Sequence, residues 1–309
     1  MNPTTQSVKV SVILPNYNHA NYLVQRIESI LNQKVHEIEI IVLDDCSTDS
    51  SREILSRYQS DPRVVYTDFA TVNCGSAFQQ WNKGLRMAKG EFVWIAESDD
   101  YCSPDFLEKV MQPLLADDEC VFSFCASRLV DTDGQDLGIF QKDRKSGVFE
   151  GAAFIRKNLC WHNNVANASA VVLRREVLQH ADPFYQSFRS VGDWLLWIQL
   201  AEKGRVAYCA EPLNYFRQHG NNTTQKLMRE GRSFEEYSVV LKYLKSRSHI
   251  GIWKYYAIKI RAARYIHQHF RDREKRERLF RKYDVNFFDR LLLYPVRWVF
   301  CLKHFVLKQ

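Results

Sequence analysis

The residues best suited to chemistry in this sequence are three carboxylates at the end of an apolar run, in the segment GEFVWIAESDD. Glu97, Asp99 and Asp100 lie so close in the chain that their negative charges repel one another. Such a group is favourable when a divalent cation or the hydroxyls of a ribose share it, since Mg²⁺ or Mn²⁺ needs few protein oxygens besides phosphate and water. The alternative is a turn or a helix start, because the sequence SPD follows at 103–105.

A second acidic pair follows another apolar run, in the segment LDDCSTDSS. Asp44 and Asp45 would lie beside the first group if the two runs are neighbouring strands of a parallel sheet. Asp45 is then placed to accept a hydrogen bond from the imide of a nucleobase. Capping of the next helix by Ser47 or Thr48 is the structural alternative, and the loop can do both.

Further candidates stand in the second half of the chain. Arg217 and His219, two positions apart in YFRQHGNNTT, suit a diphosphate, because Arg forms two parallel hydrogen bonds with phosphate. A lone His is more often structural. The segment before the run NASAVVL supplies candidate contacts for an acceptor substrate, with a surface loop as the alternative: Trp161, His162, Asn163 and Asn164.

Alternating strands and helices must position these groups. Strands are predicted at 8–14, 38–43, 64–66 and 92–96, and helices at 22–31, 52–58 and 77–88. Continuous β-branched apolar runs are typical of parallel strands buried on both faces. The order predicts an α/β fold with a doubly wound, mostly parallel sheet that binds ligands outside the carboxyl ends of its strands.

Beyond residue 120 the pattern is mixed and is expected to form a substrate-facing half. It predicts a strand at 121–125, a turn at 131–134, a helix from Gly151 and a strand at 168–173.

The C-terminal part differs in charge and periodicity. Residues 226–309 contain 21 Lys and Arg against 8 Asp and Glu, whereas residues 1–225 contain 22 against 28. Helical spacing of apolar residues predicts helices at 234–244, 252–270, 273–283 and 287–307. Residues 286–309 resemble an interfacial amphipathic helix bent at Pro295, which suits a membrane surface. A solvated helical face, or packing on the rest of the protein, is the alternative.

Length and composition are those of a globular protein. The 309 residues are 46% hydrophobic and 26% charged, with a net charge of +7, and can form one or two domains. The eight cysteines lack metal-binding spacing, which favours a reducing compartment. Since neither a signal peptide nor an apolar stretch of about 18 residues is present, we expect a cytoplasmic protein.

Six separated segments resemble the family 2 glycosyltransferases, which have the nucleotide-diphospho-sugar transferase (GT-A) fold. They are VSVILPNYNHANYLVQRIESILNQ, IEIIVLDDCSTDSS, VNCGSAFQQWNKGLRMAKGEFVWIAESDD, NASAVVLRREVL, SVGDWLLWIQLAEKG and YFRQHGNNTT, in family order. The resemblance covers about residues 8–225. It implies a catalytic domain at 1–225, with a donor half at about 1–120 and an acceptor half at about 121–225, followed by a basic, aromatic-rich helical extension at 226–309.

The resemblance also implies roles for single residues. Pro15, Tyr17 and Asp45 would surround the nucleobase. Asp99 would contact the ribose, and Asp100 would bind a divalent metal, Mn²⁺ or Mg²⁺. His219 would approach this metal or the diphosphate, with Arg217 as a further contact. Asn73 falls in the family segment that leads into the acidic motif.

Asp193, in SVGDWLLW, is the general base that the resemblance implies. An alcohol that attacks an anomeric carbon must lose its proton as the new bond forms, and a positioned carboxylate can accept it. The metal would neutralise the charge of the departing diphosphate, so no separate acid is required. The alternative is that Asp193 caps the helix that contains WLLW.

Two departures from the family pattern leave an alternative open. Glu97 stands where members commonly have Asp, and Trp81-Asn82 where they commonly have Arg-Asn, so an inactive transferase-like scaffold is conceivable. A nucleotidyltransferase is a second alternative, although the first loop, PNYNHAN, has no glycine. The absence of GxGxxG disfavours a dinucleotide-binding module, and no nucleic-acid-binding motif is recognised.

The combined prediction is a metal-dependent, inverting glycosyltransferase that moves a sugar from a nucleotide-diphosphate donor to an acceptor hydroxyl in bacterial surface polysaccharide assembly. The basic extension suggests a glycan or lipid-linked acceptor and contact with the inner face of the plasma membrane through residues 286–309. The donor base and the sugar are left open.

Overall fold

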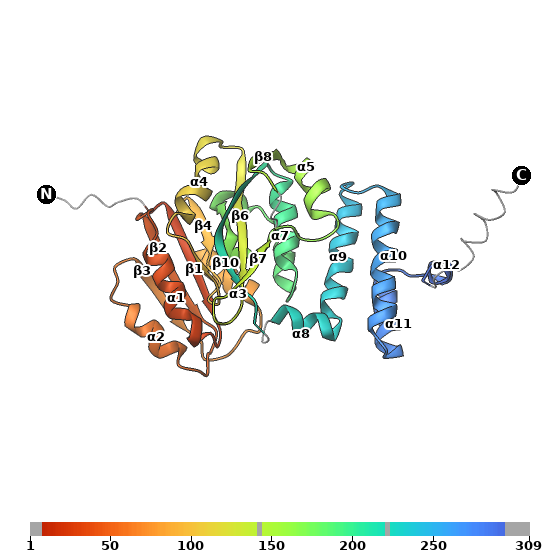
Figure 1. The fold of residues 1–309 in the computed structure, drawn as a ribbon, viewed down its shortest axis with the longest axis horizontal. Coiled ribbons are helices and arrows are strands. Elements are labelled where there is room, and N and C mark those ends of the chain that lie inside the picture. The colour runs from red at the N-terminus through yellow and green to blue at the C-terminus, as the bar shows by residue number, and fades with distance from the viewer. Residues whose placement is uncertain (1–7, 141–143, 220–222, 294–309) are drawn as a thin grey trace, which may run out of the picture. The chain divides into compact units, whose positions relative to one another are not determined.

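The computed structural model describes residues 8–140, 144–219 and 223–293. The chain forms two compact units, Met1–Lys226 and Leu227–Gln309 (Figure 1).

Four strands of the first unit form a parallel sheet. β1 (Val10–Asn16) lies between β2 (Ile38–Asp44) and β4 (Phe92–Ile95), and β3 (Val64–Phe69) pairs with the other side of β2. The connecting helices are α1 (Ala20–Leu31), α2 (Ser51–Tyr58) and α3 (Ala77–Met87). The predicted alternation of strands and helices is confirmed in this half.

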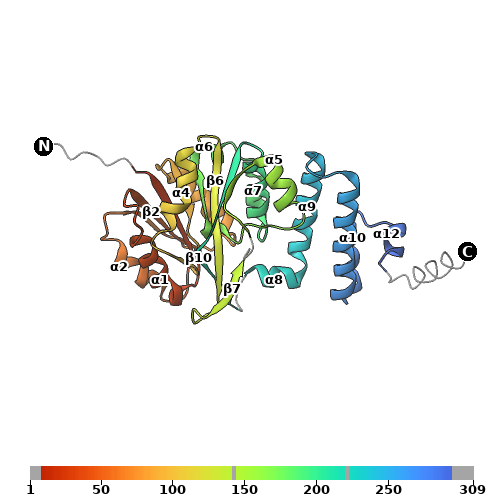
Figure 2. The same cartoon turned by 45° about the horizontal axis from the view of Figure 1, so that its top comes forward.

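The remaining strands extend this sheet in the order β4-β9-β6-β10-β5. They are β5 (Tyr101–Cys102), β6 (Cys120–Val130), β9 (Val171–Arg174) and β10 (Arg205–Arg217), with β7 (Asp136–Phe140) beside β6 and β8 (Gly147–Glu150) beside β10. β6 and β10 are parallel, whereas β9, β5, β7 and β8 pair antiparallel. Figure 2 shows β7 returning along β6 as a hairpin. The predicted α/β class with a mostly parallel sheet is confirmed.

Helices and short turns connect these later strands. They are α4 (Phe106–Ala116), α5 (Gly151–Phe154), a π-helical turn (Ile155–Leu159), a 3-10 turn (Ala168–Ala170), α6 (Arg175–Gln179), a second 3-10 turn (Pro183–Ser187) and α7 (Gly192–Ala201). The strand predicted at 168–173 therefore begins as a 3-10 turn.

Burial on both faces explains the apolar strands. All residues of β1 and β2 are buried, and Val12 and Leu14 belong to a core shared with α1 and α4. Each fully buried large apolar side chain contributes roughly 1.5–3 kcal/mol. On the other face, a Cβ atom at Gly84 would lie 2.5 Å from Cγ2 of Ile13, so glycine lets α3 lie directly on β1. This close approach positions the α3 residues that line the site.

The second unit is helical. After α8 (Thr223–Glu230) come α9 (Arg232–Ser246), α10 (Ile252–His269), α11 (Arg273–Lys282) and α12 (Phe287–Leu291). The helices predicted at 234–244, 252–270 and 273–283 are confirmed. The helix predicted at 287–307 is described only as far as Leu293, and Pro295 lies outside the described residues. None of the helices in the described ranges has the length and apolar character needed to cross a bilayer.

Candidate active site

Three polar segments meet at one edge of the parallel sheet. The strand register pairs Asn16 with Asp44 and Ile13 with Ile95. The residues that follow β1, β2 and β4 therefore emerge at the same edge, as the strand order predicts.

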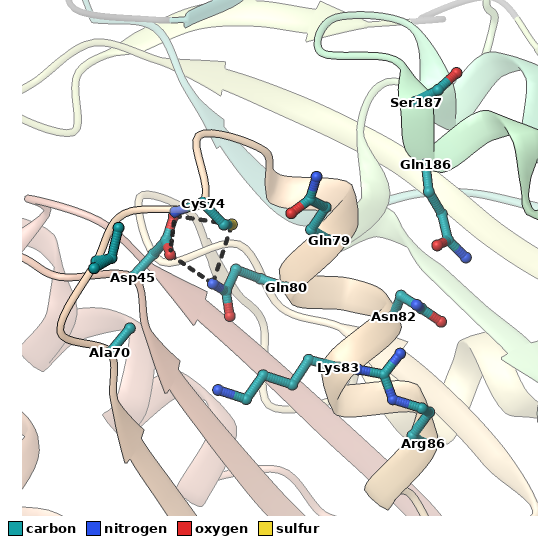
Figure 3. A pocket seen from close by; sticks show the side chains of 11 residues that line it. Asp45, Ala70, Cys74, Gln79, Gln80, Asn82, Lys83, Arg86, Gln186 and Ser187 are labelled. Carbon is teal, nitrogen blue, oxygen red and sulfur yellow. Dashed lines mark hydrogen bonds between the residues drawn. The ribbon is translucent and has the colours of Figure 1, made fainter.

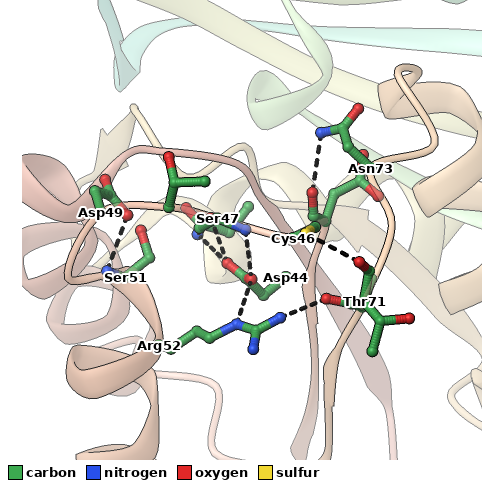
Figure 4. A network of polar contacts seen from close by, with 12 residues as sticks. Asp44, Cys46, Ser47, Asp49, Ser51, Arg52, Thr71 and Asn73 are labelled. Atoms are coloured by element: carbon green, nitrogen blue, oxygen red, sulfur yellow. Dashed lines mark hydrogen bonds and ion pairs between the residues drawn. The ribbon is translucent and has the colours of Figure 1, made fainter.

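Hydrogen bonds to Asp44 stabilise the loop after β2. Its fully buried carboxylate accepts hydrogen bonds from Asn16 Nδ2 at 2.8 Å and from N and Oγ of Ser47 at 3.0 and 2.6 Å. Arg52 Nε lies 3.6 Å from Asp44 Oδ1 (Figure 4). With these contacts in place, Asp44 supports the loop and leaves Asp45 to face the neighbouring cavity.

The helix capping expected of Ser47 or Thr48 is made instead by Asp49. Asp49 Oδ1 accepts the N–H of Ser51 and Oδ2 accepts that of Ala20, both at 2.9 Å, at the starts of α2 and α1. Ser47 Oγ is engaged by Asp44. One loop thus anchors the starts of two helices beside the site.

Asp45 lines a cavity of about 590 Å³ between the end of β3, α3 and the second 3-10 turn (Figure 3). Its carboxylate accepts the N–H of Cys74 at 3.0 Å, the Cys74 thiol at 3.2 Å and Gln80 Nε2 at 2.6 Å. Asn73 Nδ2 donates to the backbone carbonyl of Asp45 at 2.9 Å, so Asn73 also lies here. The cavity lining is Asp45, Ala70, Val72, Cys74, Gln79, Gln80, Asn82, Lys83, Arg86, Gln186 and Ser187.

The other predicted nucleobase contacts lie on β1 and its loop. Pro15 is buried within β1 and pairs with Leu43, whereas Tyr17 is 46% exposed directly after the strand. Tyr17 therefore offers an exposed ring at the edge where the three segments meet, and the nucleobase roles of both residues stay predictions.

Asp99 lies with two histidines. His219 Nε2 is 2.9 Å from Asp99 Oδ2. One ring nitrogen of His19, one ring nitrogen of His219 and one carboxylate oxygen of Asp99 all lie within 4.8 Å of one another. His19 Nδ1 also contacts Ser98 Oγ at 2.8 Å. Burial would raise the pKa of Asp99, but the hydrogen bond from His219 and the nearby His19 ring lower it. The hydrogen bond to Asp99 in turn raises the pKa of His219.

This donor set fits a divalent metal. Two imidazole nitrogens and a carboxylate oxygen suit Mn²⁺ better than Mg²⁺, which prefers oxygen ligands throughout. His19 and His219 come from segments on opposite sides of Asp99 in the sequence, so the sheet edge assembles the group. We name His19, Asp99 and His219 the His-Asp-His cluster.

Asp100 points to other partners. Its carboxylate accepts hydrogen bonds from Asn167 Nδ2 and, at 3.0 Å, from the N–H of Arg217. Burial and the charge of Asp99 raise the pKa of Asp100 to about 7. Asp100 is not part of the His-Asp-His cluster, so its role as a metal ligand stays a prediction.

The two departures from the family pattern contact each other. Trp81 is 3% exposed, and its Nε1 donates a hydrogen bond to Glu97 Oε1 at 2.8 Å. Burial, followed by the charges of Asp99 and Asp100, raises the pKa of Glu97 to about 8. The indole therefore contacts a carboxyl group whose charged form is disfavoured by burial.

Arg217 is bound by protein groups on all sides. Its guanidinium donates to the carbonyls of Asp99, Asp131 and Thr132 at 2.9, 3.1 and 2.9 Å, and to Gln25 Oε1 at 2.7 Å. With 3% of its surface exposed, Arg217 ties the acidic motif to α1 and to the 131–134 turn. Its predicted diphosphate contact would require breaking some of these bonds and stays a prediction.

Asp193 lies in the first turn of α7 and is partly buried. Asn163 Nδ2 donates to Asp193 Oδ2 at 2.9 Å. A Cβ atom on Gly192 would lie 2.8 Å from Phe78 on α3, so the start of α7 is close to the helix that carries Gln80. Its function as a base stays a prediction.

Two of the predicted acceptor contacts flank Asn163. His162 is exposed and Asn164 is partly buried. The predicted segment therefore contacts Asp193 through Asn163. The contacts of these residues with an acceptor stay predictions.

Arg26, on α1, is a buried cation beneath the acidic motif. It is 0% exposed, its Cζ lies 4.8 Å from the ring centroid of Trp94, and its guanidinium nitrogens have no hydrogen-bond partner within the described residues. Burial raises the pKa values of Glu97 and Asp100, and the charge of Arg26 acts in the opposite direction. An unpaired buried charge costs several kcal/mol, and the charge of Arg26 in turn favours the ionised forms of Glu97 and Asp100.

Sequence reasoning missed His19 and Gln80. His19 had a usable signal, because it follows the β1 strand end in the same way that Asp45 follows β2. Gln80 had none, since its partner Asp45 lies 35 positions away in the chain.

Comparison with known proteins identifies the family of this chain. The sequence profile of the glycosyl transferase family 2 matches residues 11–180. The putative teichuronic acid biosynthesis glycosyltransferase TuaG of Bacillus subtilis is 32% identical over 199 residues, which are 64% of this chain and 74% of TuaG. The chain spans about a third of the length of several other curated relatives.

Solved structures share the fold. S. aureus TarS 1-349 in complex with UDP-GlcNAc has a TM-score of 0.56 at 17% identity, covering 89% of this chain and 71% of that one. Mannosyltransferase PcManGT from Pyrobaculum calidifontis, in complex with GDP-Man and Mn²⁺, has a TM-score of 0.54 at 19% identity, covering 79% and 65%. The profile match over more than half of the chain, together with the TuaG similarity, shows that this chain is a glycosyltransferase of family 2.

Proposed function

We propose that this enzyme transfers a sugar from a nucleotide-diphosphate donor to an acceptor hydroxyl, with inversion and with a divalent metal. The observation that carries the proposal is the His-Asp-His cluster, whose Asp99 follows β4 at the same sheet edge as Asp45, a residue that lines the cavity. A metal site and a nucleotide-sized cavity at the carboxyl ends of parallel strands are the two parts that binding a sugar nucleotide requires.

His19, Asp99 and His219 would hold the metal, with Asp100 as a further predicted ligand. A bound metal supplies positive charge for the diphosphate leaving group. Mn²⁺ is our choice because of the two imidazoles, and PcManGT contains Mn²⁺ beside GDP-Man. Arg217 keeps the acidic motif and the His219 segment in register.

Asp193 is the proposed base. The bond between the anomeric carbon and the diphosphate oxygen breaks while the acceptor oxygen bonds to that carbon from the opposite side. The acceptor proton passes to the Asp193 carboxylate. Asn163 holds this carboxylate in one orientation through its 2.9 Å hydrogen bond.

The acceptor belongs to bacterial surface polysaccharide assembly in this proposal, on a glycan or a lipid carrier. Support comes from the similarity to TuaG, whose name assigns it to teichuronic acid biosynthesis.

Exposed aromatic residues on α10 and α12 support the proposal of a lipid-linked acceptor. Trp253, Phe287 and Phe288 are 85%, 70% and 75% exposed. The buried Lys259–Asp289 ion pair, at 2.6 Å, joins α12 to α10. Exposed aromatic residues on a unit rich in Lys and Arg suit an anionic lipid surface. Most of the segment 286–309, proposed from sequence for this contact, lies outside the described residues.

The test is donor turnover by the purified full chain with Mn²⁺. We expect release of nucleoside diphosphate from at least one nucleotide sugar, and loss of that release with EDTA or in Asp99→Ala. Asp133→Asn is the matched control, since Asp133 is exposed in the 131–134 turn. Absence of turnover with every donor and acceptor preparation would refute the proposal and favour an inactive scaffold.

A further inference from the structure

Tyr22 lies against both histidines of the His-Asp-His cluster. Its ring centroid is 6.1 Å from that of His19 and 5.6 Å from that of His219, and the two imidazole centroids are 5.6 Å apart. Tyr22 is partly buried in the first turn of α1. The three rings therefore pack as a triangle in which each limits the rotation of the other two.

Tyr22 joins two histidines that come from distant parts of the chain. The N–H of Tyr22 donates to the backbone carbonyl of His19 at 2.9 Å, at the start of α1. The Tyr22 ring contacts the imidazole of His219, which follows β10, with an angle of 32° between the two ring planes. This one residue therefore fixes the position of His219 relative to the first turn of α1.

Arg217 in turn holds the Tyr22 ring. The Cζ atom of Arg217 lies 4.6 Å from the ring centroid of Tyr22 and 5.4 Å from that of Tyr101. A guanidinium is attracted to the face of an aromatic ring. Because hydrogen bonds to three carbonyls and to Gln25 fix this guanidinium, it gives the Tyr22 ring a stationary partner.

The contact with Tyr22 differs in kind from the hydrogen bond between Asp99 and His219. A metal held between Asp99 and His219 would replace that hydrogen bond, because a nitrogen must give up its proton to bind a metal. A ring that packs against the imidazole uses neither of its nitrogens. The Tyr22 contact can therefore hold His219 both before and after a metal binds.

We propose that Tyr22 is a positioning residue for the metal site, whose ring holds the imidazoles of His19 and His219 in the orientation that lets both bind one ion. This inference rests on the proposed function, which assigns the metal to the His-Asp-His cluster. Tyr22 acts on metal affinity and not on the chemical step, because its ring works through the two histidines. Replacing a residue that orients metal-binding histidines lowers metal affinity about 10- to 100-fold.

Titration of the full chain with Mn²⁺, followed by electron paramagnetic resonance of free Mn²⁺, tests the proposal. We expect Tyr22→Leu, which removes the ring, to raise the Kd for Mn²⁺ at least about tenfold. Tyr22→Phe keeps the ring and should stay within about twofold of the parent chain. Tyr58→Leu is the matched control and should also leave the Kd unchanged, because Tyr58 is a partly buried tyrosine that contacts α1 through Glu28 at 2.9 Å.

Donor turnover gives a second measurement, which a purely structural role of Tyr22 would not change in the same way. In Tyr22→Leu, the Mn²⁺ concentration that gives half of the maximal rate should rise by a factor similar to that of the Kd. The rate at saturating Mn²⁺ should stay within about threefold of the parent rate. A lower rate at saturating Mn²⁺ with an unchanged Kd would contradict the proposal.

The titration also separates this inference from the proposed function. If the parent chain and Tyr22→Leu bind Mn²⁺ equally well, the role of Tyr22 is overturned and the proposed function stands. A Kd as high in Tyr22→Phe as in Tyr22→Leu would overturn the role of the ring. A parent chain that binds no Mn²⁺ would overturn this inference together with the metal of the proposed function. If circular dichroism shows that Tyr22→Leu is unfolded, Tyr22→Met replaces it, with the same expected loss and the same contradicting outcome.

Discussion

Replacing Asp193 by Asn separates catalysis from helix capping at one position. The amide keeps the size of the side chain and can still accept the hydrogen bond of Asn163, but it cannot take a proton. Loss of a general base is expected to lower turnover about 100- to 10,000-fold. Because the substituted group does not contact the donor in the proposed mechanism, donor affinity should stay within about twofold.

The structural cost of the same change is small. Removing a negative charge from the first turn of α7 costs about 0.3–1 kcal/mol. Replacing a charged hydrogen-bond acceptor by a neutral one costs about 1 kcal/mol more. The sum of about 1–2 kcal/mol leaves a protein of ordinary stability folded, so a purely structural Asp193 predicts nearly normal turnover.

The assay combines steady-state turnover, calorimetric donor binding and thermal unfolding of both proteins. Asp182→Asn is the matched control, because Asp182 accepts the N–H of Phe184 at 2.9 Å at the start of the second 3-10 turn. It should lose similar stability and keep its turnover. Turnover of Asp193→Asn within about threefold of the parent enzyme would refute the assignment of the base.

Four further outcomes are expected. His219→Ala should weaken Mn²⁺ binding by at least about tenfold, measured by electron paramagnetic resonance of free Mn²⁺; unchanged affinity would exclude His219 as a ligand. The pKa of Glu97 in the folded protein, about 8, lies above its ordinary value of 4.5. The metal-free protein should therefore lose stability as the pH rises from about 4.5 to 8, because the folded state resists the loss of this proton. An unfolding midpoint that does not change with pH over this range would contradict the expectation. Trp81→Phe should lower the free energy of unfolding by about 1–3 kcal/mol in denaturant, because it removes the hydrogen bond to Glu97. The double variant Trp81→Phe with Glu97→Ala should lose less free energy of unfolding than the sum of the two single variants. Strict additivity would show that the two side chains do not interact. Trp253→Ala should reduce flotation with phosphatidylglycerol vesicles relative to Leu137→Ala, an exposed apolar residue on β7, and equal flotation of the two variants would argue against the proposed surface.

The first half of the sheet was predictable because its strands carry their own signal. The run at 38–43 is apolar at nearly every position, and β2 is buried on both faces. The 168–173 segment looks similar, yet β9 pairs antiparallel with β4 and β6. Strand direction depends on the path of the chain, which the apolar run does not record. β7 and β8 are short and partly exposed, so they lack that signal altogether.

The site was predictable in its location and less so in its contacts. Parallel strand ends place Asp45 and Asp99 at one edge from connectivity alone. That Asp99 and not Asp100 contacts His219 depends on side-chain directions across 120 positions of sequence. Likewise, Trp81 and Glu97 each look like a defect when taken singly, because the hydrogen bond that joins them exists only in the folded protein.

The buried guanidinium of Arg26 has a consequence for building hybrid enzymes. α1 and the acidic strand end are distant in sequence, yet the charge of Arg26 on α1 lowers the pKa values of Glu97 and Asp100. A chimera whose α1 comes from a relative without this arginine would keep the buried carboxyl groups and lose the positive charge that favours their ionised forms. Domain-swapping experiments within this family should therefore transplant the two segments as a pair.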